Sequence, residues 1–287
     1  MHENDNAYES LAEAHGGEAR WAYGTGFDDP LAGVDTTVPA GVDARELAAT
    51  CLALGDDALV LAQRLASWVS CAPELEDEVA LANIALDLLG QARLLLTRAA
   101  AADPSLRPAG APEHIPDEDA LAYFRDPDAF CNVVFAELDD GGDFAAAIVR
   151  LFVMSAWRLA IVQRLAAHAD PVLSAIAVKA VAELTYHRDY AAGWLVRLGD
   201  GTDESHTRMQ SAVDALLPRV AELYAADPLS AVETDAVIDD VLSTATLVRP
   251  RTSRVAIEGR AFQHTSALAE LLAELQGVAR AHPEASW

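Results

Sequence analysis

The sequence predicts an all-α protein built as a bundle of long helices. Three observations support this fold class. Stretches rich in leucine and alanine and poor in proline recur along the chain, and short connections that contain proline or glycine separate them. Alternation of polar and apolar residues, the mark of a half-buried strand, is almost absent, and only residues 254–257 resemble a short strand. Because 52% of the 287 residues are hydrophobic, the chain can bury a sizeable core.

The first 42 residues have a different composition from the rest. The segment WAYGTGFDDPLAGVDTTVPAG, which ends at Gly41, contains glycine and proline at short intervals. Such a composition is typical of an extended arm and not of a packed element. We therefore expect residues 1–42 to form a partly ordered arm and residues 43–287 to form the helical domain.

The segment from Glu74 to Ala102 is predicted to be the central helix of the bundle. It contains no proline, acidic residues crowd its start, and two arginines lie near its end, which is the order that the helix dipole favours. Most of its faces are apolar, and a helix that is apolar nearly all round belongs in the middle of a bundle. Asn83, Asp87 and Gln91 are spaced four apart and so share one face.

Other helices follow from the same patterns and from their end signals. Asp43 and Asp143 are expected to cap two of them, and the sequence Gly199-Asp200-Gly201 to end a third. Breaks are expected near residues 126–127 and at Pro218. These helices are predicted at residues 43–70, 117–138, 143–168, 171–198, 202–226, 235–247 and 262–282.

The helix at 171–198 repeats the polar pattern of the helix at 74–102. Lys179, Glu183 and His187 are again four apart and share one face. The first helix offers Asp56 or Asp57 for the same interior layer. Four helices that each direct carboxylates or histidines inward form the site of di-iron carboxylate bundles, so this layer is a candidate metal site.

The candidate layer departs from the di-iron pattern in three respects. The helix at 74–102 has no histidine, the histidine at 171–198 stands four residues after its glutamate instead of three, and helix 143–168 offers only Ser155 in place of an acid. Two interpretations stay open: a working di-metal site, and a degenerate metal layer that is now a buried polar network with no metal and no catalytic residue. The residues of this layer are Asp56, Asp87, Gln91, Lys179, Glu183 and His187.

Charge and cysteine content restrict the possible partners and the compartment. The chain has 20 basic and 45 acidic residues and a net charge of −25, which argues against nucleic acid or an anionic membrane as a partner. Lys179 is the only lysine, which fits a cytoplasm rich in salt and equally a GC-rich genome. Three cysteines without a CxxC pair, a polar start and the lack of a long uncharged apolar run predict a cytoplasmic chain without a transmembrane helix.

Several segments resemble one known family. LGDDALVLAQRLASW, ALANIALDLLGQAR and ELTYHRDYAAGWLVRLGDGT are similar to the C subunits of phenylacetyl-CoA epoxidase (phenylacetate-CoA oxygenase), the PaaC family. The resemblance extends over residues 52–287. A generic bundle would not carry the second and third segments together.

The resemblance implies a ferritin-like helical bundle with additional C-terminal helices. It implies a non-catalytic structural subunit of a multicomponent monooxygenase in aerobic phenylacetate catabolism. In that complex a homologous A subunit holds the di-iron centre and forms the ring 1,2-epoxide, and a reductase subunit supplies electrons. No cofactor is then expected in this chain. Two alternatives remain from the residues alone: a self-sufficient ferritin-like di-metal oxidase, and a module that docks acyl-CoA.

Overall fold

The computed structural model describes residues 31–251 and 259–285. Two units are distinguished along the chain, residues 1–32 and 33–287, and the description that follows concerns the second. Every regular element in the described residues is a helix, which confirms the all-α class. The short strand predicted at 254–257 and most of the predicted arm lie outside the described residues.

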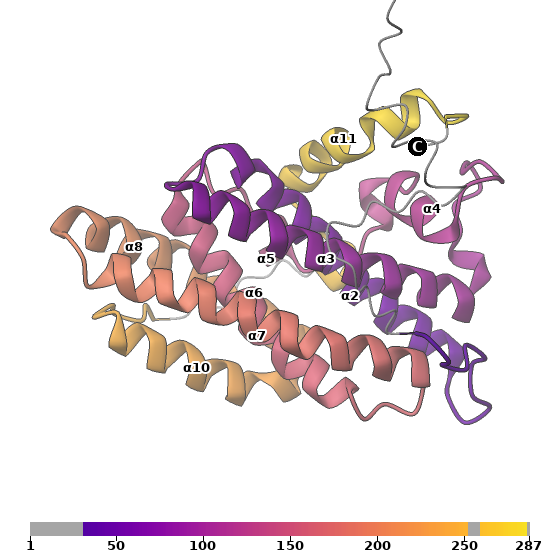
Figure 1. Cartoon of the computed structure of the whole chain (residues 1–287), viewed down its shortest axis with the longest axis horizontal. Helices are drawn as coiled ribbons and strands as arrows, with labels where there is room; N and C mark the ends of the chain where they lie inside the picture. Colours follow the sequence, from indigo (N-terminus) through magenta and orange to yellow (C-terminus); the bar gives the residue numbers. More distant parts are fainter. Residues whose placement is uncertain (1–30, 252–258, 286–287) are drawn as a thin grey trace, which may run out of the picture. The chain divides into compact units, whose positions relative to one another are not determined.

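Four long helices make the core. Helix α2 (Ala44–Ala66) packs along α3 (Leu75–Ala102), and α6 (Phe144–Leu165) packs along α7 (Pro171–Gly199), while α3 also contacts α7 (Figure 1). The remaining α-helices are α4 (Asp117–Tyr123), α5 (Val134–Glu137), α8 (Asp203–Leu216), α9 (Val220–Ala226), α10 (Ala231–Thr244) and α11 (Ser266–Ala281). The 3₁₀ helices are η1 (Ser67–Ser70), η2 (Pro104–Leu106), η3 (Pro127–Ala129), η4 (Leu217–Arg219), η5 (Pro228–Ser230) and η6 (Gly259–Ala261).

The predicted end signals act as expected at several helices. The Asp43 carboxylate accepts hydrogen bonds from the backbone at the start of α2, and the Asp143 carboxylate does the same for α6. Pro218 interrupts the predicted helix 202–226, which divides into α8, η4 and α9.

The predicted helix at 117–138 is interrupted near residues 126–127 as expected, but less of it is helical than predicted. Only α4, η3 and α5 form within it, because Pro127 disfavours a continuous helix and because nearby backbone groups bond elsewhere. The backbone N–H of Cys131 donates to Asp56 at 3.0 Å, and that of Val133 donates to Asp57 at 2.8 Å. Side chains of α2 thus hold this segment in an extended path.

Helix α6, and not α3, is the buried centre of the bundle. Both helices are long and apolar enough to span a membrane. In the most apolar 18-residue stretch of α6, 94% is buried inside the protein, whereas in the corresponding stretch of α3 only 44% is buried. Leu75, Val79, Leu86 and Leu89 of α3 are exposed. The expectation that α3 is covered on all sides is therefore wrong, because its described neighbours leave part of its apolar surface open.

Candidate functional site: a buried polar network

Five of the six predicted site residues meet along the contact between α3 and α7. The Gln91 amide donates to Glu183 Oε2 at 3.0 Å, and the Lys179 ammonium forms an ion pair with the other oxygen of the same carboxylate. Four residues away along each helix, His187 Nε2 lies 3.0 Å from Asp87 Oδ2. The shared spacing of four residues thus does place these side chains opposite one another.

The sixth residue, Asp56, belongs to a separate group. Its fully buried carboxylate is held by the Arg125 guanidinium, with Nη1 at 3.0 Å from Oδ2, and by the backbone N–H of Cys131. The expectation that Asp56 shares contacts with Glu183 and His187 is therefore not met. Arg125 lies just after α4, in the segment that was predicted to be helical.

A third group surrounds Asp57 and contains two arginines that the sequence did not identify. Arg260 binds the Asp57 carboxylate, with Nη1 at 3.0 Å from Oδ1, and Arg158 Nη1 lies 3.7 Å from Oδ2. Arg158 also donates to Gln91 Oε1 at 3.0 Å and to the Leu54 carbonyl at 2.9 Å. Arg158 therefore links Asp57 of α2 to the α3–α7 contact.

Arg158 brings a cation where a di-iron bundle would need an acid. It lies on α6, the helix for which the sequence offers only Ser155, and 1% of its side chain is exposed. Burial lowers the pKa of Arg158 to about 10, and the nearby Asp57 carboxylate opposes this shift, so the guanidinium stays charged at neutral pH. The Ser155 hydroxyl is buried without a hydrogen-bond partner among the described residues.

The interior residues do not fit a pair of metal ions. Iron in such a bundle needs several carboxylates and histidines directed at one point. Within residues 31–251 and 259–285, no three or more His, Cys, Asp or Glu side chains converge in that way. Of the predicted carboxylates, Asp56 and Glu183 are already neutralised by Arg125 and Lys179.

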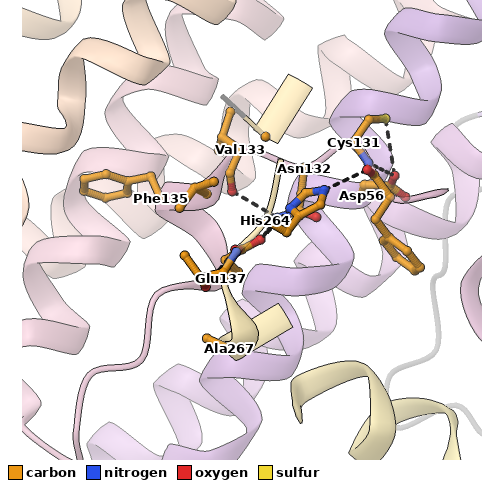
Figure 2. A network of polar contacts seen from close by, with 12 residues as sticks. Asp56, Cys131, Asn132, Val133, Phe135, Glu137, His264 and Ala267 are labelled. Atoms are coloured by element: carbon orange, nitrogen blue, oxygen red, sulfur yellow. Dashed lines mark hydrogen bonds and ion pairs between the residues drawn. The ribbon is translucent and has the colours of Figure 1, made fainter. Parts of the chain in front are cut away.

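A further buried carboxylate, Glu137, forms a network of its own (Figure 2). His264 Nδ1 lies 2.8 Å from Glu137 Oε2, and His264 Nε2 lies 2.8 Å from the Phe130 carbonyl oxygen. Both partners are acceptors, so the imidazole donates from both nitrogens and carries a positive charge. Thr265, just before α11, donates its backbone N–H and its hydroxyl to Glu137 Oε1 at 2.6 and 2.9 Å.

The environment of His264 favours the protonated form. Burial lowers its pKa, but the hydrogen bonds to Glu137 and to the Phe130 carbonyl and the charge of Glu137 outweigh burial, and the net pKa is raised. Only 7% of the His264 side chain is exposed, so it lies inside the protein and not on a solvated face. In the sequence, the sign that Glu137 is buried and needs a partner is its place within the apolar run VVFAEL.

The buried cysteines do not add a nucleophile to these groups. The pKa of Cys51 is raised to about 12, mainly because the thiol is buried. Burial is also the main reason why the pKa of Cys131 is raised. A thiol with a raised pKa is protonated at neutral pH and is a poor nucleophile. The described networks therefore hold backbone segments together and present no evident catalytic set.

Comparisons with known proteins show which family the helical unit resembles. The family model described as "Phenylacetic acid catabolic protein" matches residues 33–287. The C subunit of the 1,2-phenylacetyl-CoA epoxidase of Escherichia coli (strain K12) is similar to the chain, with 40% identity over 257 residues. The match covers 84% of this chain and 99% of that relative. The family model therefore matches the whole unit at residues 33–287, and the relative is matched over almost its complete length.

Proposed function

The chain belongs to the family of phenylacetic acid catabolic proteins, and from that premise we propose that it is the non-catalytic C subunit of a phenylacetyl-CoA epoxidase. Identity to a C subunit over nearly its full length supports the assignment. The observation that carries the non-catalytic role is the neutralisation of the interior carboxylates by neighbouring cations. Arg158 and Arg260 flank Asp57, and Lys179 pairs with Glu183.

In this role the chain supports a catalytic partner and carries out no oxidation itself. The partner is a homologous A subunit, which holds the di-iron centre, and a reductase subunit supplies its electrons. Together they insert one oxygen atom into the aromatic ring of phenylacetyl-CoA in the cytoplasm. A permanent interface of this kind buries on the order of 2,000 Å² or more, and the exposed apolar side chains of α3 supply part of that surface.

Co-expression with the A subunit tests the proposal. We expect the two chains to purify as one complex, and epoxidation of phenylacetyl-CoA by A subunit and reductase to require this chain. A chain that stays a monodisperse monomer in the presence of the A subunit, or an epoxidase that is fully active without it, would refute the supporting role.

The self-sufficient oxidase predicts a different metal content. We expect far less than one iron per chain in protein purified without added metal. About two irons per chain, the content of a di-iron carboxylate bundle, would instead favour the oxidase.

The acyl-CoA-docking module is tested by calorimetric titration. Phenylacetyl-CoA that binds the isolated chain as tightly as it binds the complex would favour the module. Binding that needs the A subunit agrees with the structural role.

A further inference from the structure

An apolar groove lies between α2, α3, α4 and α11. It has two lobes, one of about 320 Å³ against α2 and α3, and one of about 390 Å³ against α4 and α11. Tyr123 and Leu275 line both lobes, which are therefore neighbours. We call these two lobes together the apolar groove.

The rim of the groove carries several of the large apolar side chains that the fold leaves exposed. Leu86 of α3 is 63% exposed and Leu89 is 42% exposed, and both line the first lobe. Val278 of α11, in the second lobe, is 59% exposed. Contiguous apolar surface of this kind marks an interaction site when the rest of the surface is highly charged.

The lining of the groove argues against an anionic ligand such as an acyl-CoA. Among the described residues, no arginine or lysine lines either lobe, and the titratable side chains that do are Asp119, Tyr123 and His282. The first lobe is lined by apolar side chains with the exceptions of Gln63 and Tyr123. Phosphate groups need cations or directed N–H groups, so the occupant is an uncharged, apolar surface.

Charge also argues against a second copy of the chain as the occupant. Each copy has a net charge of −25, so self-association brings two strongly acidic surfaces together. A different chain without this excess of acid meets no such repulsion. The open face of α3 from Ala82 to Leu89 is about 10 Å long, or two helical turns, which is the length over which another helix can pack.

Building on the proposed function, we propose that the apolar groove receives an apolar helical segment of the catalytic A subunit. Side chains on one face of that helix enter the two lobes on either side of Tyr123 and Leu275, as in other complexes in which an amphipathic helix lies in a groove. The groove thereby accounts for the exposure of Leu86 and Leu89 on α3.

The test places a charge in each lobe of the full-length chain. The variants are Leu86→Glu and Val278→Glu, and the control is Val232→Glu, an 84% exposed residue of α10, which does not line the groove. All three positions are exposed, so we expect circular dichroism and melting temperature to match the wild type. Affinity for the A subunit is measured by calorimetry, and assembly by light scattering after size exclusion.

We expect Leu86→Glu and Val278→Glu each to weaken binding by at least about tenfold, since a charge buried at the centre of an interface has a hot-spot effect. Val232→Glu should bind like the wild type. Equal binding by all variants would overturn the groove assignment and leave the proposed function intact.

Two other outcomes would assign a different occupant to the groove, and a third would refute the proposed function on which this inference rests. A wild-type homodimer that Leu86→Glu dissociates would identify a second copy as the occupant and overturn the proposal. Binding of phenylacetyl-CoA to the isolated chain that Leu86→Glu abolishes would identify a ligand site and overturn it as well. A wild-type chain that does not bind the A subunit would refute the proposed function, and this inference with it.

Discussion

Replacing Asp57 by asparagine tests whether the buried arginines depend on this carboxylate. Asp57 is fully buried, and it compensates Arg158, which is 1% exposed, and Arg260, whose side chain is 23% exposed. Asp57→Asn keeps the size of the side chain and removes its charge. Arg260 can regain contact with water, whereas Arg158 cannot. The change therefore leaves one deeply buried cation without its carboxylate.

The expected loss follows from that unpaired cation. Removing one partner of a buried ion pair costs about 3–5 kcal/mol in the free energy of unfolding. For a domain of this size each kcal/mol lowers the melting temperature by about 2–4 °C, so Asp57→Asn should lower it by about 6–20 °C. A second change, Arg158→Met, removes the stranded charge and should restore at least half of the loss.

Urea unfolding followed by tryptophan fluorescence measures this effect. Trp157 is a suitable probe because it is fully buried and lies near Arg260, whose guanidinium carbon is 5.8 Å from the ring centroid. The control is Asp126→Asn, whose side chain is 72% exposed beside Arg280 and whose loss should change stability by less than about 1 kcal/mol. A loss below about 1 kcal/mol for Asp57→Asn, or no recovery in the double variant, would refute the reasoning.

Three further predictions concern titration, packing and salt. His264 has a raised pKa in the folded chain, so its stabilisation is complete below its ordinary pKa of about 6.5 and is lost as the pH rises through the higher folded value. His264→Gln should remove that part of the pH dependence of urea unfolding, and an unchanged profile would contradict the charged Glu137 contact. Gly259→Ala should destabilise by about 1–3 kcal/mol because an added Cβ would lie 2.0 Å from the Asn132 carbonyl oxygen. Gly90→Ala, where no described atom outside its own helix turn lies within 4 Å, should be neutral or stabilising in the same assay. The chain has a net charge of −25, and salt screens the repulsion between its acidic side chains, so its melting temperature should rise between low and molar KCl. A melting temperature that does not depend on salt would argue against an acidic surface adapted to salt.

The long helices could be predicted because their signals are local. Apolar periodicity located α3, α6 and α7, and Asp43, Asp143 and Pro218 marked ends or a break that the structure has. The extended path at residues 130–133 was not predicted because its backbone groups bond to Asp56 and Asp57, some 75 residues earlier in the chain. Which face of α3 is covered also depends on neighbours that periodicity does not specify.

The candidate site could be predicted only within one pair of helices. A spacing of four residues placed Gln91 opposite Glu183 and Asp87 opposite His187, because α3 and α7 are regular where they meet. Apart from Arg158 of α6, the partners of Asp56 and Asp57 come from loops and from the C-terminal segment, for which spacing carries no information. Arg158 could have indicated a buried ion pair from the sequence, since an arginine within an apolar helix needs a buried acceptor.

The position of Arg260 and His264 makes the C-terminal segment part of the interior of the bundle. Arg260 neutralises an acid of α2, and His264 does the same for Glu137 of α5, although more than 120 residues separate each pair. A nascent chain that has not yet reached residue 260 therefore contains two buried acids with no counter-charge from this segment. The bundle can reach its final stability only after residues 260–264 have been added, and a truncation before them would act on its centre.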